Sequence, residues 1–439
     1  MTDRDDNEAS TPALDWLFGL QRFGVKPGLE RARALLTALE LPAPGTQVVL
    51  VAGTNGKGTV TRLVSAALTA AGNVTGSFFS PHLERVGERA RIDGEDSATA
   101  AMESAVANVR PAAEELGCTF FEVAVAAALY RFREAGANWV VMECGMGGRY
   151  DATNVLDPVL SAVTGVALDH QTVLGSTIAA IAVDKAGVLR EGVPAVTGAD
   201  GDALEVIEQA AGQVGAPLLA LGRDFVTDVH HSGWDGLRLT VSPTSRPVVG
   251  LPLTLSTPLV GSHQAANVAV AAVSAMRLGV SHGAIIDAFS TTRWPGRLER
   301  FDLDRAWVLD GAHNRQAAQA LAASVAALGP PPAALVLGVS ADKDVAGVLA
   351  PLVDMGVTIV ATRASNSPRA LQPGVIADIA RALGTGEVHE EEGPRQALEK
   401  ARRLTSEGDL VLVAGSLFLV GEVRTLLRGA SPEGRSRWQ

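Results

Sequence analysis

Short apolar runs alternate along the chain with longer stretches in which apolar residues recur every three or four positions. The first clear run, residues 48–52, is apolar and mostly β-branched, as is typical of a buried strand. A glycine-punctuated segment follows, and then an Ala-rich helical pattern that ends at Gly72. Further strands are predicted at 74–79, 139–143, 159–164, 193–197, 306–309, 334–338, 357–361 and 410–414. Further helices are predicted at 12–24, 28–41, 97–116, 119–136, 177–189, 262–279, 314–327, 343–352, 370–383, 393–405 and 416–427.

Two interruptions of this rhythm indicate how the chain is divided. Residues 198–260 have an irregular, β-rich pattern with a hairpin expected at 230–241, and WPGRLER at 294–300 has the character of a linker. Alternating strands and helices predict an α/β protein with parallel sheets. We therefore expect a large parallel-sheet domain at 11–293 and a smaller one at 301–439. Both ends of the chain are expected to be irregular, with a disordered tail at 1–10 and a frayed SPEGRSRWQ.

Composition narrows the class of protein. Of 439 residues 47% are apolar and 19% charged, which indicates a folded globular chain, and the net charge of −11 argues against nucleic acid or an anionic membrane as partner. No apolar run reaches the ~18 residues of a membrane span, and the acidic start is unlike a secretory signal. Cys118 and Cys144 are too few for a disulfide scaffold or a zinc site. We expect a soluble cytoplasmic protein.

An anionic substrate of so acidic a protein would need a locally basic pocket. Two groups of arginines are candidates for its lining: Arg85, Arg89 and Arg91, and Arg293, Arg297 and Arg300.

The loop GTNGKGT at 53–59 lies between the first strand and its helix, where a loop can cradle phosphate. Its glycines let backbone N–H groups turn inward, and the helix N-terminus adds partial positive charge. Lys57 could reach the terminal phosphates and the Thr59 hydroxyl could ligate Mg²⁺. The loop departs from the general P-loop pattern because Gly58 separates Lys57 from Thr59. The alternative interpretation is an ordinary glycine-rich turn.

Polar side chains follow several predicted strands, where the ligand crevice of an open α/β sheet lies. Thr59, Ser80, Glu143 and His170 would supply oxygens and one imidazole, which suit Mg²⁺. Each residue alone could instead be a cap, a salt-bridge partner or a packing residue.

A second polar group lies near the linker and beyond it. Asp310 and His313 in VLDGAHN follow a strand, and Arg297 could grip an anion between the two domains. Asn267 could contact a base edge. Caps, turns and surface positions are the alternatives. Lys185, from its position alone, is better explained as a residue on a solvated helix face.

Cys144 invites interpretation as a nucleophile, but no dedicated base is apparent beside it. A free cysteine is more often a small buried residue.

Ten motifs in fixed order resemble the folylpolyglutamate synthase and dihydrofolate synthase group of the Mur ligase superfamily. They are GTNGKGT (53–59), SPHLERV (80–86), FFEVAVAAALYRF (120–132), ECGMGGRYDATNV (143–155), LDHQTVLGSTIAAIAVDKAG (168–187), GSHQAANVAVA (261–271), WPGRLE (294–299), LDGAHN (309–314), DKD (342–344) and AGSLFLVGEVR (414–424). The GTNGKGT form of the loop, with its extra glycine, is itself part of the resemblance.

The resemblance implies an N-terminal P-loop ATPase-like α/β domain and a C-terminal Rossmann-like ligase domain, with ATP between them. It also implies a reaction in which ATP phosphorylates a carboxylate and L-glutamate attacks the acyl phosphate, giving ADP, phosphate and an amide. Dihydropteroate and reduced folates are the expected acceptors. The RYDATN form of one loop favours both dihydrofolate synthase and folylpolyglutamate synthase activity. A monomer using two Mg²⁺ ions is expected.

The resemblance also assigns roles to residues by position. ATP-binding residues are Gly53, Thr54, Asn55, Gly56, Lys57, Gly58, Thr59, Asn267, Arg297, Asp310 and His313. The metal residues are Thr59, Ser80, Glu143 and His170, and the folate residues are Phe121, Arg149, Asp151 and Asn154. Lys185 matches a lysine carboxylated on its amine, which reverses the expectation from position alone, and it joins Lys57 and His170 as a catalytic candidate. Cys144, Met146 and Asp184 depart from the usual family residues, which leaves the packing of their loops open.

Four alternatives remain. The chain could be a folylpolyglutamate synthase only, or a muramyl-peptide ligase, although only about 45 residues precede the first strand, too few for a separate sugar-nucleotide domain. A P-loop NTPase switch would leave the second domain without a role. A degenerate nucleotide-binding scaffold would leave the filled polar positions unexplained.

Overall fold

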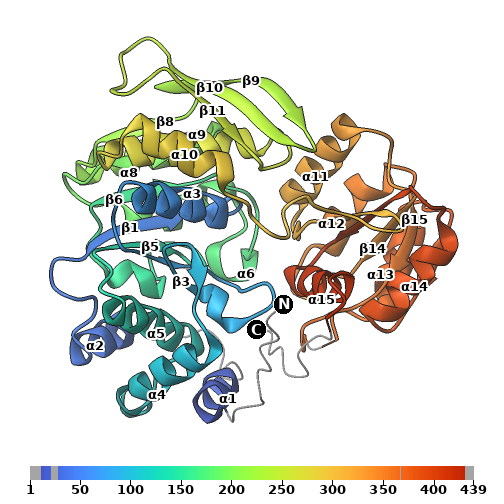
Figure 1. Cartoon of the computed structure of the whole chain (residues 1–439), viewed down its shortest axis with the longest axis horizontal. Coiled ribbons are helices and arrows are strands. Elements are labelled where there is room, and N and C mark those ends of the chain that lie inside the picture. The colour runs from blue at the N-terminus through green and yellow to red at the C-terminus, as the bar shows by residue number, and fades with distance from the viewer. Residues whose placement is uncertain (1–10, 21–27, 366, 431–439) are drawn as a thin grey trace, which may run out of the picture.

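The computed structural model describes residues 11–20, 28–365 and 367–430. The expectations for both tails, and for residues 21–24 of the first helix, lie outside these ranges. The described residues form two α/β lobes, each built on its own largely parallel sheet, and a small antiparallel sheet beside the first lobe (Figure 1). The predicted fold class is confirmed.

The N-terminal lobe is organised by an eight-stranded sheet of order β4-β3-β2-β5-β1-β6-β7-β8. Its strands are β1 (Gln47–Ala52), β2 (Thr75–Phe78), β3 (Ala90–Ile92), β4 (Glu95–Asp96), β5 (Trp139–Glu143), β6 (Leu160–Val163), β7 (Ala195–Thr197) and β8 (Leu218–Ala220). The register pairs Val51 of β1 with Glu143, and Ala52 with Val163 of β6. The loop at 53–59, which we call the phosphate-type loop, and the segments that follow β5 and β6 therefore leave the sheet at neighbouring points.

Helices cover both faces of this sheet, and each face has its own apolar core. One core contains α1 (Pro12–Gly19), α2 (Glu30–Ala38), α4 (Thr99–Glu115), α5 (Phe120–Glu134), α7 (Ile178–Lys185) and α8 (Gly201–Val214). The other contains α3 (Lys57–Ala70), α9 (Gln264–Arg277) and α10 (His282–Thr291). The short α6 (Gln171–Leu174) follows His170. Thr119 caps α5 in the expected capping box with Glu122.

Two expectations for this lobe were incomplete. Residues 198–260 are not uniformly β-rich, because α8 lies within them and buries Ala203, Ile207 and Ala211 at four-residue intervals. Helix α10 was not predicted. Its N-cap, Ser281, accepts a hydrogen bond from the backbone N–H of Ala284.

The expected hairpin is present in the small sheet formed by β9 (Phe225–Gly233), β10 (Gly236–Pro243) and β11 (Leu253–Thr257). Trp234 occupies its turn and packs against the core of the C-terminal lobe. The guanidinium of Arg300 lies 5.0 Å from the centroid of the Trp234 ring. The hairpin therefore connects the two lobes far from the linker in sequence.

The C-terminal lobe has a six-stranded sheet of order β12-β13-β17-β14-β15-β16. The strands are β12 (Glu299–Asp302), β13 (Ala306–Leu309), β14 (Ala334–Leu337), β15 (Thr358–Ala361), β16 (Val388–Glu390) and β17 (Leu410–Ala414). One face is covered by α11 (Arg315–Leu328), α12 (Val345–Val353) and α13 (Pro373–Ala382), and the other by α14 (Pro394–Leu404) and α15 (Leu417–Leu427). Because β12 begins at Glu299, the last two residues of the expected linker belong to this sheet.

None of the helices among the described residues is long and apolar enough to cross a membrane.

Candidate functional site at the cleft between the lobes

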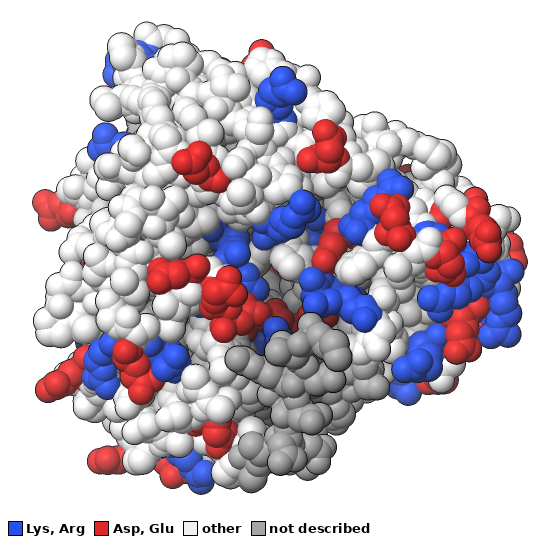
Figure 2. Space-filling view, in the orientation of Figure 1, with Lys and Arg blue, Asp and Glu red and all other residues white. Residues whose placement is uncertain are grey.

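A cavity of about 400 Å³ lies between the two lobes. Lys and Arg side chains gather around the hollow between them (Figure 2). The sequence-predicted residues that line the cavity are the whole loop 53–59, Ser80, Glu143, His170, Lys185, Asn267, Arg297, Asp310 and His313. Every residue predicted to bind nucleotide or metal is thus brought to one cavity. The four predicted folate residues are not among its lining.

The loop between β1 and α3 is shaped by two glycines with left-handed backbone conformations. Gly53 has a φ of +143°, and a Cβ there would lie 1.8 Å from Oγ1 of Thr164. Gly56 has a φ of +87°, and its Cβ would lie 2.1 Å from Oδ1 of Asn267. Only glycine fits both places, so the loop can lie directly against its neighbours.

Hydrogen bonds from the chain after β6 fix this loop in place. The backbone N–H of Ala167 donates to Oγ1 of Thr54 (3.0 Å), and Oγ1 of Thr164 donates to the carbonyl of Asn55 (2.6 Å). Lys57 folds back over the loop, with Nζ 3.0 Å from the carbonyl of Thr54. The lysine amine is therefore held against the loop, in the lining of the cavity.

Lys185 is buried rather than solvated. Its side chain, at the end of α7, is 3% exposed, and Nζ donates to the carbonyl of Gly53 at 2.8 Å. Burial, together with the charge of Lys57, lowers the pKa of Lys185 to about 7. The solvated-face interpretation from position alone is wrong, because α7 turns this residue towards the phosphate-type loop.

Glu143 is a buried carboxylate beside the same loop. Its Oε2 accepts a hydrogen bond from the backbone N–H of Ser80 at 3.2 Å. Burial raises the pKa of Glu143 to about 7, although Lys57 and Arg297 act in the opposite direction. A cation at this carboxylate would relieve the cost of ionising it in a buried place.

The donor set predicted for Mg²⁺ fits this chemistry. Thr59 and Ser80 add hydroxyl oxygens to the Glu143 carboxylate, and hard oxygens are what Mg²⁺ prefers. Across the described ranges no three His, Cys, Asp or Glu side chains cluster as a self-sufficient metal site. A metal ion here would thus depend on hydroxyls, water and ligand phosphates as well.

His170 has a left-handed backbone, with a φ of +49°. Burial and the nearby Lys343 lower the pKa of its imidazole to about 4. A neutral ring at physiological pH keeps a lone pair available to a metal or a proton.

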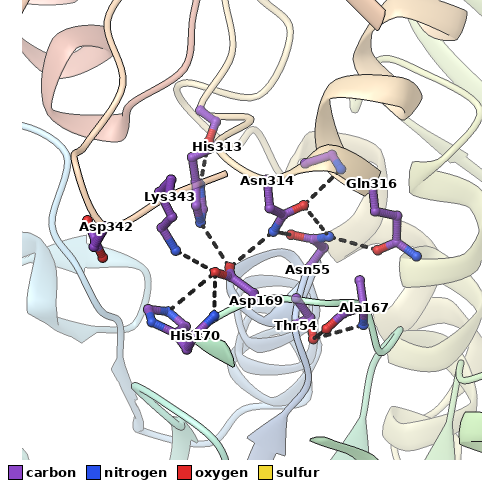
Figure 3. Close-up of polar contacts among 12 residues, drawn as sticks. Thr54, Asn55, Ala167, Asp169, His170, His313, Asn314, Gln316, Asp342 and Lys343 are labelled. Atoms are coloured by element: carbon purple, nitrogen blue, oxygen red, sulfur yellow. Dashed lines mark hydrogen bonds and ion pairs between the residues drawn. The ribbon is translucent and has the colours of Figure 1, made fainter. Parts of the chain in front are cut away.

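Asp169, which sequence reasoning did not select, is the centre of a polar network between the lobes (Figure 3). Its Oδ1 lies 2.6 Å from Nζ of Lys343, and its Oδ2 accepts from Nδ2 of Asn314 at 3.1 Å. Asn314 also donates to Asn55 of the phosphate-type loop at 3.0 Å, and Asn55 donates to Gln316 at 2.8 Å.

The positive charges around Asp169 favour its ionised form, which accepts the hydrogen bonds of this network. Burial alone would raise the pKa of Asp169, but Lys343 and the two nearby histidines outweigh burial and hold that pKa below its usual range. Asp169 adjoins the predicted His170 in the motif at 168–187, and Lys343 is the central residue of the DKD motif. Their place within these motifs was the one feature of the sequence that could have identified them as site residues.

Asp310 ties the linker to the C-terminal sheet. Its carboxylate accepts from the backbone N–H groups of Leu298 (2.9 Å) and Ala312 (2.8 Å). Beside it, burial and Lys343 lower the pKa of His313 to about 4. Arg297 forms no ion pair with any residue in the described part of the chain, and it faces the cavity. Its charge is available to an anion.

The predicted folate residues shape a neighbouring loop. Oδ2 of Asp151 accepts from the backbone N–H groups of Gly145 (2.8 Å) and Met146 (3.0 Å). Nδ2 of Asn154 donates to the carbonyl of Arg149 at 3.0 Å, and Arg149 itself is exposed. Their contact with a folate stays a prediction.

Two further residues pack this loop. Phe121 packs against Gly145, where a Cβ would lie 2.5 Å from Cζ of the ring. Cys144 is fully buried, burial raises the pKa of its thiol, and Thr153 donates to its sulfur at 3.3 Å. A buried, protonated thiol matches the expected packing residue.

Two parallel-sheet lobes around a P-loop cleft are the architecture of a Mur ligase, and comparison with known families agrees. The Mur ligase middle domain matches residues 51–275, and the Mur ligase glutamate ligase domain matches residues 296–417. The chain belongs to the folylpolyglutamate synthase and dihydrofolate synthase family of Mur ligases.

Relatives in this family are similar over most of the chain. Dihydrofolate synthase/folylpolyglutamate synthase of Escherichia coli is 33% identical over 433 residues, covering 98% of both chains. The solved structure of the bifunctional Yersinia pestis enzyme complexed with AMPPNP and Mn ion has a TM-score of 0.83 and 30% identity, covering 97% of this chain and 100% of that one. A probable bifunctional folylpolyglutamate synthase/dihydropteroate synthase of Haloferax volcanii is 37% identical over 423 residues, which is 94% of this chain. The chain spans only 50% of that relative's length.

Proposed function

We propose that this protein is an ATP-dependent ligase that attaches L-glutamate to a folate-type carboxylate, acting on both dihydropteroate and reduced folylglutamates. The observation that carries the proposal is the meeting of Lys57, Glu143 and Lys185 with Arg297 in one cleft between two lobes. The names of the relatives supply the substrate class.

The reaction follows from the chemistry of a carboxylate, which is a poor electrophile. An oxygen of the acceptor carboxylate bonds to the γ-phosphorus of ATP, and ADP leaves. The glutamate amine then attacks the acyl carbon, loses a proton, and phosphate leaves. Lys57 and Arg297 would offset the charge that builds on the transferring phosphoryl group. Contact between the lobes would keep water from the acyl phosphate.

Thr59, Ser80, Glu143 and His170 are the residues that we propose hold Mg²⁺. When bound, the ion supplies charge neutralisation and polarises the phosphate oxygens. The buried carboxylate with a raised pKa and the neutral imidazole support this assignment.

Lys185 supports a second metal interaction in this proposal. Because its pKa is lowered to about 7, a substantial fraction of its amine is neutral at physiological pH. A neutral amine can add to CO₂, forming an N–C bond and releasing a proton, and the resulting carbamate presents two oxygens to a cation. The 2.8 Å approach of Nζ to Gly53 places it beside the phosphate-type loop.

The remaining assignments complete the proposal. Asn267 would contact the base or ribose of ATP, and Asp310 and His313 would position the nucleotide from the C-terminal lobe. Phe121 and the loop around Asp151 would border the pteridine. We also propose that the lobes, at 11–293 and 301–439, act as separate domains about the short linker.

The function is tested by supplying ATP, Mg²⁺ and radiolabelled L-glutamate with dihydropteroate or with a reduced folylmonoglutamate. Label should enter both acceptors, with one ADP formed per amide. Incorporation into the folylmonoglutamate alone would limit the protein to folylpolyglutamate synthase. Incorporation into neither would overturn the folate assignment, and ADP release without any acceptor would favour an NTPase.

A further inference from the structure

A second cavity, of about 180 Å³, adjoins the first. The two cavities share Gly58, Ser80, Pro81, Glu143, Arg297 and Leu417 in their linings. The shared wall is the place where, under the proposed function, a phosphoryl group meets the acceptor carboxylate. Whatever occupies the second cavity is therefore continuous with the reacting atoms.

Arginines from three parts of the chain line this second cavity. Arg85 and Arg91 come from one of the two clusters noted in the sequence, and Arg297 comes from the other. Helix α15 adds Arg424, the last residue of the AGSLFLVGEVR motif, and Arg428 directly follows the end of that helix. Folding thus gathers five guanidinium groups that are up to 343 positions apart in sequence, the span from residue 85 to residue 428.

Acidic side chains also line this cavity, but their oxygens are largely engaged within the protein. Glu88 accepts the backbone N–H groups of Leu83, Glu84 and Arg85 at 2.6 to 2.9 Å. Burial raises the pKa of the Glu88 carboxyl, although these hydrogen bonds act against the shift.

Two ion pairs engage Glu84 and Asp96. Glu84 lies 2.6 Å from Arg424, and Asp96 lies 2.7 Å from Arg91. These pairs build the walls of the cavity. Glu143, on the wall shared with the first cavity, forms no ion pair among the described residues and accepts from the backbone N–H of Ser80.

Three guanidinium groups remain available. Arg85 and Arg428 are 56% and 55% exposed, and each lies 3.6 Å from its nearest carboxylate, which is longer than a good charged hydrogen bond. Arg297 forms no ion pair among the residues that the structure describes. The cavity therefore offers one cation at the wall it shares with the nucleotide cleft and two that are open to solvent.

We propose that this second cavity binds the oligo-γ-glutamyl tail of the acceptor, an inference that rests on the proposed function. Each γ-linked residue leaves one free α-carboxylate, so the tail is a flexible polyanion. Its terminal carboxylate must reach the shared wall to be phosphorylated, while earlier residues need a place adjoining it. Arg85 and Arg428 pair with those α-carboxylates, and longer tails gain more contacts than the monoglutamate does.

The test compares kcat/KM for mono-, di- and tetraglutamyl forms of one reduced folate in Arg85→Ala, Arg428→Ala and the double variant. We expect the ratio of tetraglutamyl to monoglutamyl kcat/KM to fall about three- to ten-fold in the double variant. Added salt should lower the same ratio in the wild type. Arg246→Ala, which removes an exposed arginine outside both cavities, should leave the ratio unchanged.

A binding arm uses tetra-γ-glutamate peptide without a pteridine as a competitive inhibitor. The peptide should inhibit the wild type and the Arg246→Ala variant, and inhibit the double variant more weakly. Equal inhibition of all three, or an unchanged tail-length ratio, would overturn the inference. A rise in KM for L-glutamate at every tail length would overturn it in favour of a site for the incoming amino acid.

The outcomes separate this inference from the function on which it rests. If the wild type glutamylates a folylmonoglutamate but all variants have the same ratio of tetraglutamyl to monoglutamyl kcat/KM, only the proposed tail-binding site is refuted. If the wild type incorporates no glutamate into any acceptor, the proposed function itself fails.

Discussion

At the scale of single residues, two buried ionisable groups of opposite kind titrate near the same pH in one cleft. Burial raises the pKa of Glu143 to about 7 and lowers that of Lys185 to about 7. Both shifts have one cause, because a buried site disfavours whichever form of a group is charged. Holding either group in its charged form in this cleft therefore costs free energy. A bound cation beside Glu143, or covalent modification of the Lys185 amine, would relieve that cost.

Replacing Glu143 by Gln should stabilise the metal-free protein while abolishing ligation. Because the folded pKa lies above the usual 4.5, the wild type loses stability as the pH rises from 4.5 through 7. Above pH 7 the variant should therefore be more stable by on the order of 2–3 kcal/mol. Thermal unfolding in EDTA between pH 4.5 and 8.5 measures this difference.

The gain should shrink towards zero as the pH approaches 4.5, where both proteins carry a neutral side chain at this position. Glu114→Gln, on an exposed part of α4, should show no comparable gain. A Glu143→Gln variant that is no more stable at pH 8 would show that this carboxylate ionises without cost.

Lys185→Ala should lose ligase activity and regain part of it when short carboxylates are added. Acetate or formate would place oxygens in the space left by the side chain, standing in for a carbamate. Reaction rates with and without 50–200 mM carboxylate would measure the effect, a range on the order of weak small-anion affinities. A variant as active as the wild type would indicate that the buried amine only packs against Gly53.

At the scale of elements, the turn from β1 to α3 shapes part of the wall of the cleft between the lobes. The glycines of this turn can be read from the sequence. The requirement for glycine at each position, however, comes from a neighbouring side chain in the folded structure. Gly53 lies against Thr164 and Gly56 against Asn267, residues that are distant in the chain. A motif can thus predict the loop without predicting what the loop touches.

Gly56→Ala should raise KM for ATP at least about ten-fold, because the added methyl overlaps the Asn267 amide and strains a backbone at positive φ. Gly72→Ala is the matched control. Gly72 has a similar φ of +89° at the other end of α3, with open space around its would-be Cβ. The control should lose stability but keep its KM. Equal effects on KM would mean that backbone strain alone, without the contact to Asn267, disturbs the site.

Most strands and helices could be predicted because their apolar periodicity is strong and their ends are marked. Helix α8 shows where this failed. Its buried positions, Ala203, Ile207 and Ala211, have helical spacing, but two of the three are alanines that give little hydrophobic contrast. The strand-like pattern of the residues that follow therefore led to a β-rich prediction for the whole segment 198–260.

The site was predictable in part for a related reason. Residues after strand ends in the sheet could be grouped, because parallel strands bring their carboxyl ends together. Asp151 could not be assigned in this way, since its backbone hydrogen bonds to Gly145 and Met146 depend on the local path of the loop. The pairing of Asp169 with Lys343 depends on how the lobes approach one another, which no local pattern encodes.

At the scale of the whole molecule, the two lobes meet through a buried ion pair as well as through the linker. Asp169 and Lys343 have side chains only 8% and 11% exposed. Breaking such a pair leaves one charge buried without its partner, which costs more than losing a surface pair.

Lys343→Met should therefore lower stability by about 3 kcal/mol and loosen the contact between the lobes. The double variant Asp169→Asn/Lys343→Met should be less affected than Lys343→Met alone, giving a coupling energy above about 1 kcal/mol. Thermal unfolding and the small-angle scattering radius measure the two effects. The exposed pair Arg300–Asp302, treated in the same way, should show a coupling below about 1 kcal/mol. Additive effects at Asp169 and Lys343 would show that their contact does not hold the lobes.

The hairpin that carries Trp234 onto the C-terminal lobe has a mechanical consequence. Polar contacts between the lobes, such as Asp169–Lys343 and Glu84–Arg424, would have to break for the cleft to open. Two further attachments, the chain at 294–298 and Trp234 seated beside Arg300, could persist during opening. A body attached at one point can swivel in any direction, whereas a body attached at two points turns about the line between them. Opening and closing of the cleft should thus be a rotation about a single axis that passes through both attachments. Lys343 and His313 of the C-terminal lobe would then move along one arc towards the phosphate-type loop.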